Sequence, residues 1–194
     1  MMIFAAKIIW CVGVIAWFVI RYPHARRSKR TPARRAENRG LEIVLLSISA
    51  TGLGVIPAVY AATGMPALAD YPLHVWQLVA GGLTFLASLV LFRRTHAALG
   101  RNWSVTLEVR EKHALVTDGI YRYVRHPMYT AFWLWAIAQA LLLPNWVAGF
   151  SGIVGFGTLY VFRVPREEQM MLDTFGTSYA DYAKRTGRVF PKLR

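Results

Sequence analysis

Cysteine, acidic residues and paired metal ligands are scarce in this chain of 194 residues. Cys11 is the one cysteine, so the sequence provides no disulfide framework. Ten Asp and Glu stand against 23 Lys and Arg, which gives a formal net charge of +13 at pH 7. The histidines do not recur at the spacing of zinc ligands and none pairs with a cysteine, so we expect no metal site. They are His24, His74, His96, His113 and His126.

A glycine-rich nucleotide fingerprint is missing as well. The stretch Thr51-Gly52-Leu53-Gly54 comes nearest to one, but it has no third glycine and no preceding strand. The sequence therefore predicts no Rossmann fold.

Hydrophobic residues make up 55% of the chain, and they are grouped into blocks that carry almost no charge. The blocks cover residues 8–20, 43–63, 73–92 and 128–162, and the last is interrupted once, at Pro144-Asn145. A membrane-spanning helix needs about 20 apolar residues, whereas buried helices of soluble proteins have shorter apolar runs, of about 14. We therefore predict an all-α polytopic membrane protein with five transmembrane helices, of which the last two form a hairpin.

The basic residues alternate along the chain with the apolar blocks. They are dense after the first, third and last blocks, but the connection 64–71 and the Pro144-Asn145 turn contain no Lys or Arg. The positive-inside rule then places the N-terminus outside and the C-terminus in the cytoplasm. The cations would contact membrane lipid, and we expect no nucleic-acid partner because they do not form one basic surface with interleaved aromatic residues.

Small residues recur at helical spacing in two of the apolar blocks. Ser47 with Thr51, and Ala50 with Gly54, would allow helices of the first half to approach closely. The glycines of the last block could serve the same purpose, or they could leave room for a ligand against the backbone. They are Gly149, Gly152, Gly155 and Gly157.

An Arg-His-Pro triplet stands at the start of the last apolar block, in the sequence YVRHPMY at residues 123–129. Proline disfavours helical conformation in the residue before it, so we expect His126 to be extended and Pro127 to begin the helix. The N–H groups of that helix start would lie beside Arg125 and His126 and attract an anion. Alternatively, Arg125 contacts lipid phosphate and His126 faces water.

A second charged motif, FRVPREE at residues 162–168, is expected to end the fifth helix. The chain after it would form a separate C-terminal helix whose apolar face holds Met170, Met171, Phe175, Tyr179 and Tyr182. Because a two-residue turn joins the fourth and fifth helices, RHPMY and RVPREE should face each other. Together they could bind a zwitterion such as the amino-acid end of a cofactor. Alternatively, Glu167 and Glu168 only neutralise Arg125 and Arg166.

The sequence HALVTDGIYRYVRHPMY at residues 113–129, followed by RVPREE, FGTSYADY and a closing Phe190-Pro191, resembles the isoprenylcysteine carboxyl methyltransferase family. The resemblance covers residues 97–194 in detail, and it is specific because these motifs occur together at these spacings. It implies an integral membrane enzyme that uses S-adenosyl-L-methionine to methylate the α-carboxylate of C-terminal S-isoprenylcysteine, or a similar lipophilic carboxylate, at the cytoplasmic side. Residues 1–92 would then be a three-helix transmembrane region and residues 93–194 the catalytic region.

The same resemblance implies residue roles. Arg163 would be the catalytic residue that meets the substrate carboxylate. The cofactor contacts would be His113, Ala114, Leu115, Val116, Tyr121, His126, Pro127, Met128, Tyr129 and Glu167. A family glutamine before the LVxxG stretch has no clear counterpart, although Thr106 or Glu108 could replace it. Phe132, Trp133, Trp135 and Trp146 could form the walls around a prenyl chain, or they are aromatic residues of the membrane interface and core.

Three other functions stay open on the sequence. A phospholipid N-methyltransferase would use the same cofactor, but it would need an acidic group near its amine acceptor, whereas Arg163 favours an anionic one. A membrane reductase using NADPH would need more basic residues for the 2′-phosphate. A non-enzymatic membrane scaffold would have no reason to collect charges at the two ends of the hairpin.

Overall fold

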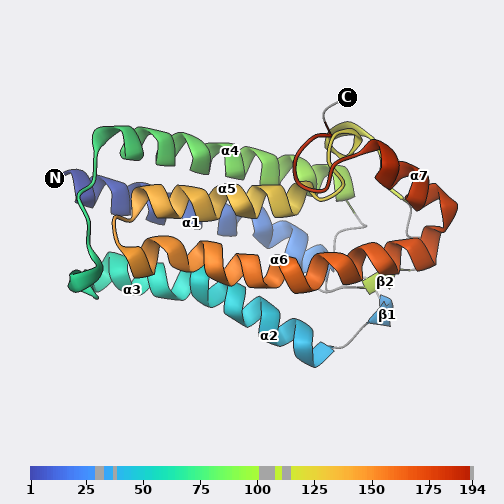
Figure 1. Ribbon diagram of the computed structural model, residues 1–194, viewed down its shortest axis with the longest axis horizontal. Coiled ribbons are helices and arrows are strands. Elements are labelled where there is room, and N and C mark those ends of the chain that lie inside the picture. Colours follow the sequence, from blue (N-terminus) through green and yellow to red (C-terminus); the bar gives the residue numbers. More distant parts are fainter. Residues whose placement is uncertain (29–32, 37–38, 101–107, 111–114, 193–194) are drawn as a thin grey trace.

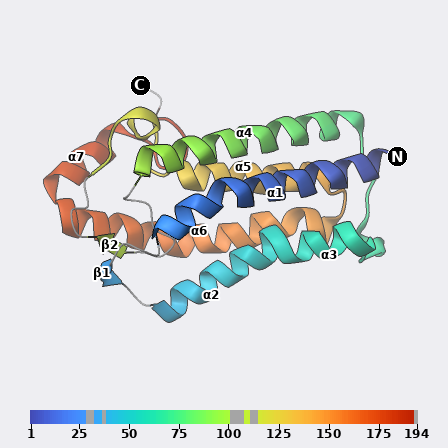
Figure 2. The same ribbon diagram turned by 180° about the vertical axis from the view of Figure 1, so that it is seen from behind.

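The computed structural model describes residues 1–28, 33–36, 39–100, 108–110 and 115–192, and it is a bundle of long helices (Figures 1 and 2). The helices are α1 (Met2–Ser28), α2 (Arg39–Ala50), α3 (Ile56–Thr63), α4 (Val75–Leu99), α5 (Pro127–Leu142), α6 (Trp146–Phe175) and α7 (Thr177–Arg185). A π-helical turn, Thr51–Val55, joins α2 to α3, and short 3-10 helices lie at Ala67–Ala69 and Gly119–Arg122. The N-terminus, the α3–α4 connection and the α5–α6 turn lie at one end of the bundle, and α7 lies at the other (Figure 1).

Four helical segments of the described chain are long and apolar enough to cross a membrane. They are Met2–Arg26, Gly40–Thr63, Val75–Leu99 and Trp146–Phe175, and they correspond to the predicted first, second, third and fifth spans. Large apolar side chains on their outer surfaces, such as Phe18, Leu83 and Val154, are more than half exposed and suit contact with lipid. The fourth predicted span is α5, whose 16 residues extend about 24 Å, less than the roughly 30 Å hydrocarbon core.

A two-stranded antiparallel sheet joins the α1–α2 connection to the α4–α5 connection. β1 (Ala33–Ala36) pairs with β2 (Glu108–Arg110), so that Arg35 lies opposite Val109 and Ala36 opposite Glu108. The prediction of an all-α protein is correct for the bundle but missed this sheet, because ARRA and EVR are too short to show the alternation that indicates a strand. The sheet lies at the same end of the bundle as α7, so the basic first and third connections and the C-terminal segment share one end (Figure 1).

The α5–α6 hairpin begins and turns where the sequence predicts. Pro127 is the first residue of α5, and the chain reverses at the Pro144-Asn145 break. The Asn145 side chain fixes the turn, because its Oδ1 accepts from the N–H groups of Val147 and Ala148 and caps α6. Its Nδ2 donates to Asp70 Oδ1 at 2.7 Å, which ties the hairpin to the α3–α4 connection.

The expected end of the fifth helix at FRVPREE is wrong. Pro165 removes one backbone N–H from the helix, but α6 continues through it to Phe175. The helix ends only at Gly176, which has a φ of 53°, a conformation that favours glycine. Residues 167–175 therefore belong to α6, and the separate C-terminal helix is the shorter α7. As a result Glu167 and Glu168 stand on a continuous helix.

Glycines allow α6 and the α2–α3 segment to approach closely. A Cβ on Gly52 would lie 2.3 Å from the carbonyl oxygen of Ser151, and one on Gly155 would lie 2.8 Å from that of Ile48. The packing interpretation of these α6 glycines is therefore correct. The contact residue of the first half is Gly52 and not the predicted Gly54, beside which no atom lies within 4 Å. The π-helical turn alters the helical periodicity here, which explains the difference.

Candidate active site

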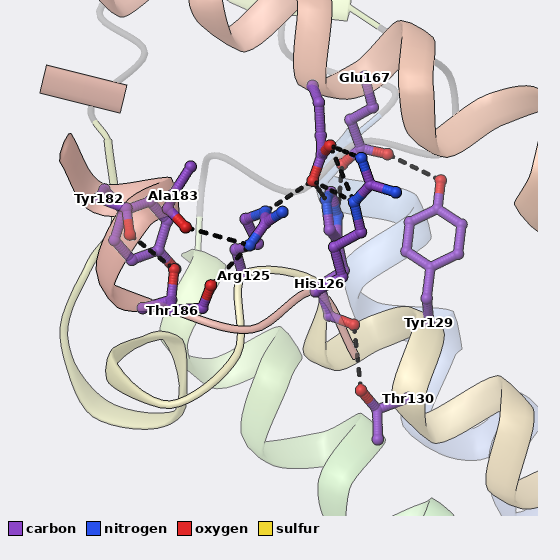
Figure 3. Close-up of polar contacts among 10 residues, drawn as sticks. Arg125, His126, Tyr129, Thr130, Glu167, Tyr182, Ala183 and Thr186 are labelled. Carbon is purple, nitrogen blue, oxygen red and sulfur yellow. Dashed lines mark hydrogen bonds and ion pairs between the residues drawn. The ribbon is translucent and has the colours of Figure 1, made fainter. Parts of the chain in front are cut away.

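The two charged ends of the hairpin meet, as the sequence predicts. Arg125, two residues before α5, donates from Nε to Glu168 Oε1 on α6 at 2.6 Å. His126 Nε2 lies 3.2 Å from the same oxygen, and the His126 ring is buried. The guanidinium and the imidazole therefore share one carboxylate at the open end of the hairpin (Figure 3).

The segment after α7 closes this arrangement. The N–H groups of Arg125 and His126 donate to the carbonyl oxygens of Gly187 and Arg188, each at 2.9 Å. The Arg188 guanidinium donates to Glu168 Oε2 at 2.7 Å, and this hydrogen bond raises the pKa of Arg188. Arg188, and not the predicted Arg166, is thus the second guanidinium on Glu168 in the described chain.

Glu167 faces the other side of the helix start. Its Oε2 accepts a hydrogen bond from the Tyr129 hydroxyl at 2.7 Å, and its Oε1 lies 3.8 Å from His126 Nδ1. The rings of His126 and Tyr129 meet edge to face, with centroids 5.5 Å apart. The Glu167 side chain keeps 29% of its surface exposed, whereas that of Glu168 keeps 13%. Glu167 is therefore the more accessible of the two acids.

Arg163 lies one helical turn before Glu167 on α6. It forms an ion pair with Glu42, a residue that the sequence analysis did not single out. Its Nη2 lies 3.1 Å from Glu42 Oε1, and both side chains are largely buried. Glu42 belongs to α2, in the half of the chain where the sequence suggested nothing reactive. The one feature in the sequence that could have marked Glu42 is its position as an acidic residue at the edge of the apolar block 43–63. Tyr129, Glu167 and Glu42 all act electrostatically on Arg163, so these four residues form one cluster.

Three tyrosines border the cluster outside the spans. The Tyr182 hydroxyl donates to the carbonyl oxygen of Tyr121 at 2.7 Å and connects α7 to the loop before α5. Burial raises the pKa of Tyr182 to about 12 and also raises that of Tyr121. The buried Tyr179 hydroxyl has no hydrogen-bond partner within the described residues, although Glu168, Arg125 and Glu167 act on it electrostatically. Burial raises the pKa of Tyr179, so its phenol is a neutral donor at physiological pH.

The other predicted cofactor contacts lie along the same loop and helix start. Leu115 and Val116 are half-buried and precede the 3-10 helix that contains Tyr121. Pro127 is buried at the start of α5, and Met128 beside it is half-buried. His113 and Ala114 lie outside the described residues, as does Thr106, and the Glu108 side chain is not described either.

The predicted wall residues separate into two groups. Trp133 contacts Phe156 and Tyr160 of α6, with ring centroids 5.3 and 5.7 Å away, and Tyr160 also contacts Tyr129. Phe132 also contacts Phe156, with ring centroids 5.4 Å apart, and stacks on Trp135 at 6.0 Å. Trp146 lies at the other end of the bundle, at the first position of α6. Trp133 therefore continues the aromatic surface that begins at the charged cluster.

The chain is similar in sequence to proteins of one family. Residues 82–173 match the model of the isoprenylcysteine carboxyl methyltransferase (ICMT) family. "Protein-S-isoprenylcysteine O-methyltransferase B" of Arabidopsis thaliana is 31% identical over 113 residues, which are 57% of this chain and 57% of that protein. "Protein-S-isoprenylcysteine O-methyltransferase" of Schizosaccharomyces pombe is 33% identical over 130 residues, 65% of this chain and 54% of that protein. The aligned regions thus span little more than half the length of these relatives.

A solved structure shares the fold. It is described as the eukaryotic intramembrane Ras methyltransferase ICMT, and it superposes with a TM-score of 0.54 at 23% sequence identity, over 79% of this chain and 53% of its own. The family match extends from α4 through α5 to Asp173 near the end of α6, and so includes both charged ends of the hairpin. Residues 82–173 are thus similar to the isoprenylcysteine carboxyl methyltransferase family, and the matched region includes α5 and most of α6.

Proposed function

We propose that this protein is a membrane O-methyltransferase that uses S-adenosyl-L-methionine to methylate the α-carboxylate of C-terminal S-isoprenylcysteine or a similar lipophilic carboxylate. The observation that carries the proposal is the position of Arg163. Its guanidinium is largely buried in an apolar bundle and lies one turn from the accessible Glu167. A cation for an anionic acceptor and an acid for a cationic methyl donor therefore lie on one face of one helix.

Arg163 would bind and orient the acceptor. A C-terminal carboxylate has a pKa of about 3.5, so it is ionised at neutral pH and needs no general base. Arginine can hold such a group through two parallel N–H donors and stays charged even in an apolar environment. Holding the reacting atoms in line can lower a barrier of this kind by about 7 to 11 kcal/mol.

The residues around Glu167 suit the donor. S-adenosyl-L-methionine supplies an electrophilic methyl group: the new bond joins a carboxylate oxygen to the methyl carbon while the methyl–sulfur bond breaks, with its electron pair left on sulfur and no proton transferred. Glu167 would bind the amino group or sulfonium charge, and Tyr129 would keep Glu167 in position. The buried Tyr179 hydroxyl, which has no partner in the described chain, is a further donor or acceptor for such a polar ligand.

The predicted contacts Leu115, Val116, Tyr121, His126, Pro127 and Met128 would form the rest of that cofactor site, with His113 and Ala114 as further contacts. The prenyl chain would lie along the aromatic surface of Tyr129, Trp133, Phe156 and Tyr160, with Phe132 as a second wall. Each buried CH2 of such a chain contributes about 0.8 kcal/mol, so this aromatic surface would supply much of the affinity.

Five membrane spans complete the proposal, with α5 as the short fourth one. The end that contains β1, β2 and α7 would face the cytoplasm, because the basic connections gather there, and the N-terminus would lie outside. Residues 1–92 would form the transmembrane support and residues 93–194 the catalytic region.

A phospholipid N-methyltransferase is the second candidate, and Glu42 favours it. An amine acceptor becomes cationic when it is methylated, and the Glu42 carboxylate beside Arg163 could accompany that charge. The two candidates differ in the acceptor group only.

A test with several acceptors separates the two functions. Purified protein in detergent is incubated with methyl-labelled S-adenosyl-L-methionine and either N-acetyl-S-farnesylcysteine, its carboxamide, or phosphatidylethanolamine. We expect label only in the first. Label in phosphatidylethanolamine alone would support the second candidate, and label in no acceptor would contradict both.

A further inference from the structure

The ion pair between Glu42 and Arg163 brings the two halves of the chain together at the candidate site. Glu42 lies in the first turn of α2, which packs along α6, and its side chain keeps 6% of its surface exposed. Arg163 keeps 12%. Glu42 stands outside residues 82–173, so the family match does not include it.

A buried guanidinium needs an anion, and Glu42 supplies one before any substrate is bound. Removing one partner of a buried pair leaves an uncompensated charge, which is unfavourable in an apolar environment. Yet a guanidinium has five N–H donors on three nitrogens, so an arginine can bind carboxylates on two of its edges. The contact at Nη2 also restricts the orientation of the Arg163 guanidinium.

Neutralisation changes how Arg163 would act on a nucleophile. An uncompensated cation at this depth would bind a carboxylate strongly and draw electron density from the oxygen that has to attack. A cation already paired with Glu42 would bind the same carboxylate more weakly, and the incoming group would also be repelled by Glu42. Binding energy that is present in the ground state and lost in the transition state slows the chemical step.

We propose that Glu42 is a positioning residue that orients Arg163 and offsets its charge, so that Arg163 aligns the substrate carboxylate without holding it too tightly. This inference rests on the proposed function. It predicts that loss of the Glu42 charge strengthens carboxylate binding and slows methyl transfer. A purely structural salt bridge predicts the opposite for binding, because disorder of Arg163 would weaken it.

The experiment compares Glu42→Gln with two other variants. Glu42→Asp keeps the charge but moves it one methylene further from Arg163. Asp173→Asn removes an exposed acid of α6, the helix that contains Arg163. Binding of N-acetyl-S-farnesylcysteine and of its neutral carboxamide is measured at equilibrium in detergent, and kcat and KM are measured for the carboxylate. A thermal unfolding curve for each variant shows that it is folded.

For Glu42→Gln we expect about tenfold tighter binding of the carboxylate, unchanged binding of the carboxamide, and a kcat about tenfold lower. Glu42→Asp should give intermediate values, and it serves as the test if Glu42→Gln does not fold. Asp173→Asn should match the wild type. Weaker or unchanged carboxylate binding in Glu42→Gln, with wild-type activity intact, would overturn the inference alone. Wild-type protein that neither prefers the carboxylate to the carboxamide nor methylates it would overturn the proposed function as well.

Discussion

Arg125 and Glu168 come from opposite arms of the α5–α6 hairpin, and their side chains are joined by a 2.6 Å hydrogen bond between Nε and Oε1. This pair fixes the position of the neighbouring residues. With Arg125 held against α6, the His126 ring lies between Glu167 and Glu168, and Tyr129 one turn later reaches Glu167. Glu168 therefore organises the end of the hairpin, and Glu167 remains accessible to a ligand.

Loss of the Glu168 charge should destabilise the protein. Glu168→Gln removes the carboxylate that Arg125, His126 and Arg188 share, and it leaves the largely buried Arg125 without its acid. We expect a decrease in stability of about 3 kcal/mol, measured by thermal unfolding in detergent. Asp181→Asn is the matched control, because Asp181 and its partner Lys184 are mostly exposed, and it should cost less than about 1 kcal/mol. Equal effects of the two substitutions would contradict the role of Glu168.

Arg163 and Glu167 should divide acceptor and donor binding. Arg163→Ala is expected to abolish methyl transfer while S-adenosyl-L-methionine still binds, because the acceptor loses its cation. Glu167→Ala is expected to weaken binding of S-adenosyl-L-methionine about tenfold or more, as a charge-assisted contact is lost. Titration calorimetry measures the affinity of each purified variant for S-adenosyl-L-methionine, and the labelled-methyl assay measures its methyl transfer. If both variants lost the same affinity for S-adenosyl-L-methionine, this division would be wrong.

Two glycines of the same helical segment should respond differently to a methyl group. Gly52→Ala places a Cβ against the Ser151 carbonyl oxygen and should lower stability by about 1 to 3 kcal/mol. Gly54→Ala meets open space and should leave stability unchanged or slightly increased, because alanine favours the helix. Thermal unfolding of the two variants in the same detergent gives the comparison. A loss of stability in Gly54→Ala as large as that in Gly52→Ala would contradict the close contact between α2–α3 and α6.

Single cysteines can establish the membrane orientation. In a Cys11→Ser background, Leu68→Cys lies in the α3–α4 connection and Phe190→Cys follows α7, both at well-exposed positions. That connection and α7 lie at opposite ends of the bundle (Figure 1). We expect a membrane-impermeant maleimide to label Leu68→Cys in intact cells and Phe190→Cys only after the cells are permeabilised. The reverse pattern would place the charged cluster outside and contradict the cytoplasmic assignment.

Local signals in the sequence predicted most of the hairpin. Pro127 and the Pro144-Asn145 break act through the conformation of their own residues, so the start of α5 and the turn could be located without tertiary information. A turn this short then required the ends of α5 and α6 to be neighbours. The pairing of Arg125 and His126 with the two glutamates follows from that geometry.

Tertiary contacts explain what the sequence did not predict. Glu42 reaches Arg163 because α2 packs along α6, and no spacing in the sequence shows which face of one helix meets another. Arg188 replaces Arg166 as a partner of Glu168 because α6 continues past Pro165 and the chain returns after α7. Gly52 replaces Gly54 because the π-helical turn alters the periodicity on which the prediction rested.

The chemical lability of the transferred methyl group tests the proposed reaction most directly. The protein is incubated with methyl-labelled S-adenosyl-L-methionine and N-acetyl-S-farnesylcysteine, and the recovered lipophilic product is treated with mild base. We predict that the label is released as volatile methanol, as from a methyl ester, and that Arg163→Ala gives no such product. A labelled product that resists base, as an N-methyl or thioether group would, contradicts carboxylate methylation.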